Sequence, residues 1–124
     1  MKINRLKKRS DFLRAQKGIR RRRDGMVLEL CASPPDQPAT GFRVGFTASK
    51  KVGNSVARNR AKRRLRALAA EILPAMAEPG SDYVFIARPQ TLERPFGLLR
   101  QDLTEVVAQA HRHRAKSAEE AKPQ

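Results

Sequence analysis

The chain has 124 residues, enough for one domain with a single modest hydrophobic core. Lysine and arginine number 27 against 12 aspartate and glutamate residues, a formal net charge of +15 that favours a polyanionic partner such as RNA, DNA or an anionic membrane surface. No apolar run approaches the roughly 18 residues of a membrane span, and no signal-peptide segment follows the basic N-terminus, so we expect a cytoplasmic protein without a membrane partner.

The N-terminal segment is strongly basic. The first nine residues carry five cations and predict an arm that becomes ordered only when it meets an anion. Ser10 then predicts the start of a short helix over residues 11–17, which Gly18 closes. Phe12 on this helix has two interpretations. It is either a core anchor or a platform on which unpaired bases stack at the edge of a cleft.

Residues 19–23 and 26–32 predict two strands of a hairpin. They flank Asp24-Gly25, a pair typical of a two-residue type I′ turn. In the second strand Met26, Leu28 and Leu30 alternate with Val27, Glu29 and Cys31. Cys31 is the single cysteine, which excludes an internal disulfide, and we expect it to be a buried core thiol. The arginines at 20–23 either protect an edge strand from aggregation or make additional phosphate contacts.

A third strand is predicted over residues 42–48, after a proline-rich loop at 33–41. Large apolar side chains alternate there with smaller or polar ones, so one face is buried. Arg43, Gly45 and Thr47 share the other face. Gly45 permits the close approach of a backbone or a ligand.

A long basic helix is predicted over residues 54–73. The chain has no carboxylate between Asp36 and Glu71, so the cations of this region lack an acidic partner close in sequence. Asn54 or Ser55 is expected to cap the helix. One buried stripe follows from spacings of three and four residues, and its members are Ala57, Ala61, Leu65, Leu68 and Ile72.

Two polar rows run beside that stripe. Arg58, Lys62 and Arg66 form the first, and Asn59 and Arg63 form the second. Arginine matches phosphate oxygens bidentately, lysine adds a point charge, and an asparagine amide can contact a sugar hydroxyl or a base edge. Lys50 and Lys51 precede the helix N-terminus, whose free amides also favour anions. The alternative is a solvated basic helix, although such helices usually mix both charge signs.

After a turn at 74–80, residues 82–88 form a nearly continuous apolar run that predicts a central strand. Residues 96–110 predict an amphipathic helix, and from residue 115 onward the chain is polar and expected to be disordered. His111 and His113 lie two positions apart, so we expect exposed side chains there and not a metal site. No close pair of carboxylates occurs in any motif, so we predict no catalytic residue and no metal ligand.

These elements predict an α+β fold. Their order is α-β-β-β-α-β-α, which favours a two-layer sandwich with a four-stranded sheet and helices on one face. We expect one domain over residues 1–114 and a disordered tail over 115–124.

The region from Ser49 to Arg66 resembles the signature of the protein component of bacterial ribonuclease P. The matching positions are Ser49, Lys50, Lys51, Val52, Gly53, Ser55, Val56, Arg58, Asn59, Lys62, Arg63 and Arg66. The resemblance in element order extends from about residue 6 to residue 110. Two departures occur: Ser55 stands where the family more often has alanine, and Met26-Val27-Leu28 occupies a strand that often carries an aromatic residue there.

The resemblance implies a ribonucleoprotein that removes the 5′ leader from precursor tRNA, with catalytic Mg²⁺ held by the RNA subunit and no obligate protein partner. It implies a left-handed crossover between the third and fourth strands. Residues implied to bind the RNA subunit are Lys50, Lys51, Asn54, Arg58, Asn59, Lys62, Arg63 and Arg66. Phe12 matches the residue that stacks on the single-stranded leader, and strand alternation adds Arg43, Thr47 and Arg88 as leader contacts.

Three other classes of protein share some of these features. A ribosomal or ribosome-assembly protein would have the same size and charge but would bind folded rRNA without preference for a tRNA precursor. A nucleoid-type protein would read duplex DNA with the basic helix, but apolar residues run through the middle of that helix and no helix-turn-helix partner is visible. An independent protein nuclease is disfavoured because paired acids and histidines are lacking.

Overall fold

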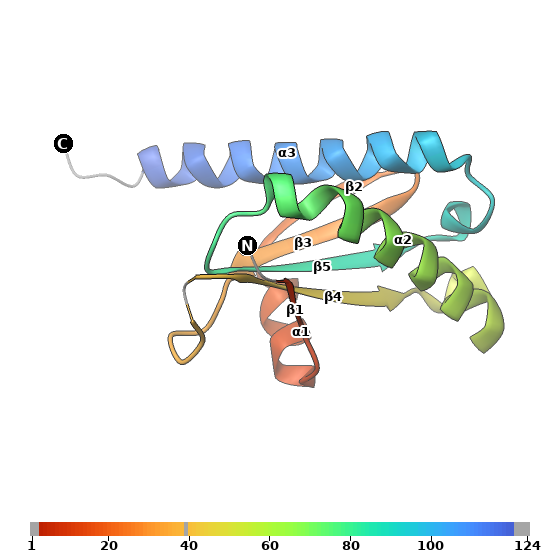
Figure 1. The fold of residues 1–124 in the computed structure, drawn as a ribbon, viewed down its shortest axis with the longest axis horizontal. Coiled ribbons are helices and arrows are strands. Elements are labelled where there is room, and N and C mark those ends of the chain that lie inside the picture. Colours follow the sequence, from red (N-terminus) through yellow and green to blue (C-terminus); the bar gives the residue numbers. More distant parts are fainter. Residues whose placement is uncertain (1–2, 39, 121–124) are drawn as a thin grey trace.

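The computed structural model describes residues 3–38 and 40–120, which form an α+β fold around one mixed sheet (Figure 1). The strands are β1 (Ile3–Arg5), β2 (Ile19–Arg23), β3 (Met26–Ala32), β4 (Phe42–Ala48) and β5 (Ser81–Ala87). The helices are α1 (Arg9–Gln16), α2 (Ser55–Met76) and α3 (Phe96–Glu120), and short 3₁₀ helices cover Lys50–Val52 and Pro89–Leu92.

The sheet has the strand order β1-β4-β5-β3-β2. β5 lies at its centre, antiparallel to β3 and parallel to β4. The unit β4–α2–β5 is therefore the crossover for which the resemblance implies a left-handed path. β2 and β1 form the two edges, and β1 pairs in parallel with β4.

Helices cover both faces of the sheet. α2 and α3 lie on one face and α1 lies on the other, as Figure 1 shows. Residues of β5 alternate between the two sides: Tyr83 and Phe85 are buried in the cluster with α2 and α3, whereas Val84 packs in the smaller cluster with α1. The larger cluster is the main core, because the amphipathic faces of both long helices meet the apolar face of the sheet there.

The prediction of a four-stranded sheet is wrong, whereas two of the predicted helices, α2 and α3, do share one face of the sheet. Ile3–Arg5 adds a fifth strand, whose residues pair with Phe42, Arg43 and Val44 of β4. A strand of three residues is too short to show an alternating sequence pattern. It forms because the open edge of β4 offers backbone hydrogen-bond partners. The first helix occupies the opposite face because Ala15 and Leu6 pack on that side against Val84. Apart from β1, the predicted element order is confirmed.

Several boundaries also differ. α1 begins at Arg9 after Lys8, which makes no side-chain capping bond, so Ser10 is not the cap. α2 continues through Pro74 to Met76, because Leu73 and Ala77 on either side remain buried. Residues 115–120, predicted to be disordered, form the last turns of α3, and residues 121–124 of the predicted tail lie outside the described part.

The hairpin between β2 and β3 has the predicted two-residue connection, with Arg23 opposite Met26. Its predicted type I′ geometry is wrong, since neither Asp24 nor Gly25 has a positive φ. Tertiary contacts hold this turn instead. The Gly25 amide donates to Asp102, and a Cβ at position 25 would lie 2.5 Å from Leu99 Cδ2. A larger residue at position 25 would therefore displace side chains of α3.

Candidate nucleic-acid interface

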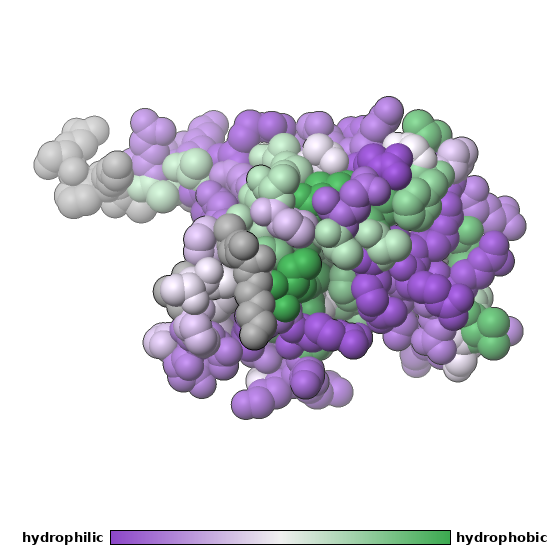
Figure 2. Space-filling model, in the orientation of Figure 1, coloured by the Kyte–Doolittle hydropathy of each residue, from purple (hydrophilic) through white to green (hydrophobic). Residues whose placement is uncertain are grey.

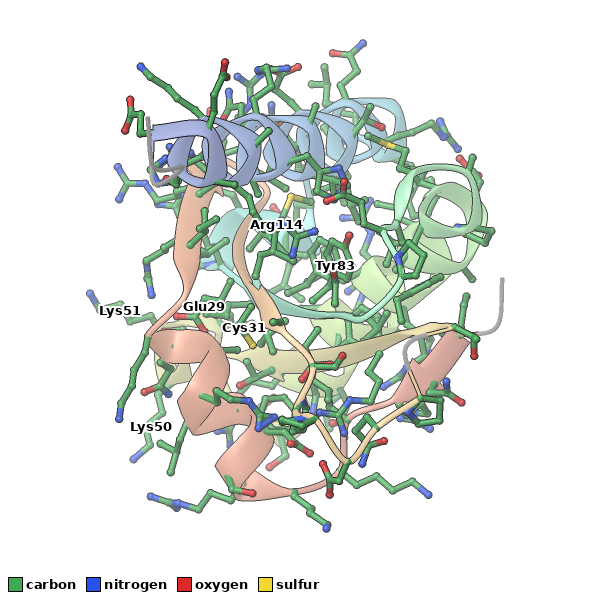
Figure 3. The ribbon with its side chains drawn as sticks, turned by 90° about the vertical axis from the view of Figure 1, so that its left-hand side faces the viewer. Glu29, Cys31, Lys50, Lys51, Tyr83 and Arg114 are labelled. Carbon is green, nitrogen blue, oxygen red and sulfur yellow. The ribbon has the colours of Figure 1, made fainter. Side chains whose placement is uncertain are left out.

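The N-terminal end of α2 is capped by Asn54, whose side-chain oxygen accepts a hydrogen bond from the Ala57 amide at 2.9 Å. This confirms one of the two predicted caps and leaves the Asn54 amino group as the part that can contact a ligand. The Ser49 hydroxyl accepts from the Lys51 amide in the preceding 3₁₀ helix. Lys50 and Lys51 are both exposed there, beside the start of α2 (Figure 3).

One face of α2 is cationic and open. Ala61, Leu65 and Leu68 are buried against the sheet, which turns the predicted polar rows toward solvent. Arg58, Asn59 and Lys62 line a hollow of about 360 Å³ together with Thr47, Ala48 and Ser55. Arg66, one turn further on, lies with its guanidinium 5.5 Å from the centre of the Phe46 ring. Figure 2 shows hydrophilic residues over the N-terminal half of α2.

The cations of this surface lack acidic partners. Within residues 3–38 and 40–120, no salt bridge within 4 Å involves Lys50, Lys51, Arg58, Lys62, Arg63 or Arg66. We call these six residues the α2 surface. Arg64 on the opposite flank differs, because its guanidinium donates to the backbone carbonyls of Thr91 and Arg94. The helix therefore separates structural arginines from those available to a ligand.

A groove of about 640 Å³ runs along the face of the sheet that carries α1. Phe12 and Gln16 of α1 line it, with Val84 and Ile86 of β5, Arg20 of β2, Glu29 of β3, Phe46, Thr47 and Ala48 of β4, and Ser49. We call it the α1 groove. It is the cleft that the stacking interpretation of Phe12 requires, and Phe12 is half-buried there, with Leu6 and Val84 nearby.

Gly45 sets the position of Phe12. A Cβ at position 45 would lie 2.7 Å from both Cε1 and Cζ of the Phe12 ring and 3.1 Å from Leu6 Cδ1. The predicted close approach at Gly45 is therefore made by the ring of Phe12, which lies directly on the backbone of β4.

Arg43 lies on the predicted face of β4 but is held by carboxylates. Its guanidinium donates to Asp82 from Nε at 2.8 Å and from Nη2 at 2.6 Å, and to Asp11 at 3.1 Å. The bonds to Asp82 raise the pKa of Arg43 above its ordinary value, against the effect of burial. Arg14 also binds Asp11, at 2.6 Å. This network fastens α1 to the sheet and keeps Arg43 out of the residues that line the groove.

The other two predicted leader residues lie apart from each other. Thr47 lines the α1 groove as predicted. Arg88 does not line it, and its guanidinium donates to the backbone carbonyls of Arg23 and Asp24 at the hairpin. Thr47 and Ala48 also line the hollow beside α2, so the α1 groove and the α2 surface meet at the end of β4.

Glu29 is a groove residue that the sequence reasoning passed over. Its side chain is 4% exposed and its Oε2 accepts from Arg20 Nη1 at 3.0 Å. Burial raises the pKa of Glu29, and the charge of Arg20 opposes that shift. The sequence did contain a signal that Glu29 has a special position, because it is the one charged residue in an otherwise apolar strand.

Three further predictions concern groups away from the groove. Cys31 is half-buried and not fully buried as predicted: it packs against the smaller core cluster on the α1 side, and burial raises its pKa (Figure 3). His111 is not exposed as predicted: its Nε2 lies 2.7 Å from the Tyr83 hydroxyl, and burial lowers its pKa. Among residues 3–38 and 40–120, no three His, Cys, Asp or Glu side chains gather as metal ligands, and no helix has the length and apolarity to cross a membrane.

Comparison with known proteins places the chain among bacterial relatives. A family model described as Ribonuclease P matches residues 1–111. The ribonuclease P protein component of Paramagnetospirillum magneticum is 50% identical, with 99% of this chain and 97% of the relative covered. That of Ruegeria pomeroyi is 51% identical over 88% of this chain and 87% of the relative.

Solved structures agree with this result. The ribonuclease P protein of Staphylococcus aureus superposes with a TM-score of 0.70 at 29% identity, over 88% of this chain and 96% of that one. The Thermotoga maritima protein has the same fold, with a TM-score of 0.69 at 23% identity, over 84% and 94%. The chain thus belongs to the ribonuclease P protein family, the protein subunits that work with an RNA subunit in maturation of the tRNA 5′ end.

Proposed function

We propose that the α2 surface, with Asn54 and Asn59, binds the RNA subunit, while the α1 groove holds the single-stranded 5′ leader of precursor tRNA in the bacterial cytoplasm. The observation that supports this division is the junction at Thr47 and Ala48, which line both hollows. An RNA subunit bound to the α2 surface therefore lies next to the leader of a precursor tRNA bound in the α1 groove. Arg20, which lines the groove, binds a phosphate of the leader, and Phe12 stacks on an unpaired base.

The chemical step is proposed to belong to the RNA. Mg²⁺ is the expected cofactor, held by the RNA subunit and the substrate. Each buried carboxylate in the described part of the chain pairs with an arginine: Asp11 and Asp82 with Arg43, Asp102 with Arg94, and Glu29 with Arg20. We therefore assign no Mg²⁺ ligand and no catalytic residue to the protein. Its contribution is electrostatic, because a cationic surface lowers the repulsion between two RNAs packed together.

Cleavage of a precursor tRNA by a bacterial ribonuclease P RNA tests this proposal. At low Mg²⁺ concentration we expect correct 5′ maturation only when RNA and protein are both present, since the protein replaces part of the screening that Mg²⁺ provides. High Mg²⁺ serves as the control, because the RNA alone is then expected to show activity. A protein that binds this RNA no better than bulk rRNA, and never stimulates cleavage, would contradict the proposal and favour a ribosomal role.

Phe12→Ala is expected to weaken binding of precursor tRNA by about 5- to 100-fold, the range for loss of one base–aromatic stack. Affinity for mature tRNA, which has no leader, is expected to stay the same. The measurement is the dissociation constant of each RNA for the assembled holoenzyme. Leu13→Ala is the matched control, because Leu13 lies on the same helix with 43% of its surface exposed and does not line the groove. Equal losses for both RNAs would remove Phe12 from the leader site.

A further inference from the structure

Glu29 places a negative charge in a groove that we assign to a polyanion. On its strand it lies directly opposite Arg20 of β2 and, on the other side, opposite Val84 of β5. Arg20, Val84 and Glu29 all line the groove, with Phe12 and Gln16 of α1 as its other wall. A carboxylate repels the phosphates of a bound RNA strand. Glu29 must therefore contact another part of the RNA.

The carboxylate has an unused acceptor. Among the residues that the structure describes, Arg20 is the only hydrogen-bond donor to Glu29, and it binds Oε2. Oε1 is not among the fully buried atoms that lack a partner, and Glu29 lines the groove, so a donor in the groove can reach it. Arg20 keeps 59% of its side chain exposed, so the same guanidinium can bind a phosphate while it pairs with Glu29.

The donors that RNA offers are the amino and imino groups of the bases and the ribose 2′-hydroxyls. Phe12 and Glu29 line the same groove. The part of the RNA that meets the Glu29 carboxylate is therefore the edge of a base stacked on Phe12, and not a phosphate. Adenine, cytosine and guanine carry an exocyclic amino group, whereas the one donor on the Watson–Crick edge of uracil, N3–H, lies between two carbonyl oxygens that repel a carboxylate. Carboxylates accept from base amino groups in the same way in DNA recognition.

We propose that Glu29 forms a base-recognition subsite: its Oε1 accepts a hydrogen bond from the exocyclic amino group of one leader base, while Arg20 binds an adjacent phosphate. This inference rests on the proposed binding of the leader in the α1 groove. Its consequence is discrimination at one leader position against uracil, of about 10- to 150-fold in affinity, the range for one hydrogen bond to a charged group.

The test compares holoenzymes that contain wild-type protein or Glu29→Gln. Precursor tRNAs with each of the four bases at each leader position are titrated against both. For the wild type we expect one position at which uracil binds about 10- to 150-fold more weakly than the other bases. For Glu29→Gln we expect this difference to fall below about 2-fold, because the new amide can donate to a uracil carbonyl. Glu93→Gln, at an exposed glutamate outside the groove, is the control.

A second measurement leaves the protein unchanged. Purine riboside lacks the amino group of adenosine, and at the selective position it is expected to lose as much wild-type affinity as uridine does. Full affinity for purine riboside would overturn the inference. So would identical base profiles for wild type and Glu29→Gln, since Glu29 would then serve only to hold Arg20. Equal binding of precursor and mature tRNA by the wild type is a different result, which would overturn the leader groove itself.

Discussion

Arg43→Ala is expected to lower the free energy of unfolding by about 3 kcal/mol, the lower end of the range for a broken buried ion pair, because Asp11 and Asp82 lose Arg43 and keep the more exposed Arg14, at 2.6 and 3.4 Å. The side chain of Asp82 is fully buried and that of Asp11 is 7% exposed, so water cannot replace the lost partner. For a chain of this size the loss corresponds to a fall in melting temperature of about 10 °C or more. Thermal and urea unfolding of the isolated protein measure it.

The matched control is Arg22→Ala. Arg22 is an exposed arginine on the edge strand β2, without a salt bridge in the described part of the chain, and its loss is expected to change stability by less than about 0.5 kcal/mol. Arg43→Lys is expected to lie between the two, because one ammonium group cannot reproduce the fork of bonds to Asp82 and Asp11. If Arg43→Ala unfolds like Arg22→Ala, the network does not fasten α1 to the sheet.

The double variant Arg58→Ala, Lys62→Ala is expected to weaken assembly with the RNA subunit by about 100-fold near physiological salt, the effect of losing two contacts to charged groups. Both side chains line the hollow beside Thr47. Each phosphate contact removed is expected to reduce the slope of log K against log salt by about 0.7–0.9. Titration of the RNA subunit at several salt concentrations measures both quantities.

Arg60→Ala provides the control for that experiment. Arg60 is exposed on the same helix but lies outside the residues that line the hollow. A general electrostatic effect would change the salt slope by the same amount for each charge removed, one in Arg60→Ala and two in the double variant. An unchanged slope in the double variant would mean that Arg58 and Lys62 are merely solvated.

Local sequence patterns predicted most of the secondary structure. The stripe of Ala61, Leu65 and Leu68 predicted α2, and the apolar run at 82–88 predicted the central strand, because burial imposes a period on the sequence. Patterns of this kind fail for short elements. Ile3–Arg5 has three exposed residues and is a strand only because β4 offers an open edge.

The site was predicted in part. Alternation put Arg43, Gly45 and Thr47 on one face of β4, and the register confirms that they share it, opposite Asp82, Val84 and Ile86 of β5. Alternation could not show that Asp82 would lie beside Arg43, since the two residues are 39 positions apart. Arg43 therefore looked like a ligand contact and is a structural residue. Glu29 was passed over for the same reason, because its partners in the groove come from other elements.

The sequence by itself determined the family and the cationic face of α2, because the signature residues are close in the chain and a helix converts their spacing directly into a surface. Only the tertiary structure decided which arginines are free to bind RNA. Arg43, Arg64 and Arg94 are engaged by carboxylates or carbonyls from distant segments, whereas Arg58 faces an open hollow. An arginine is fully available to a ligand only if no carboxylate or carbonyl of the protein already holds it. Which arginines are held depends on the segments that the sheet brings together, and these segments are distant in the sequence.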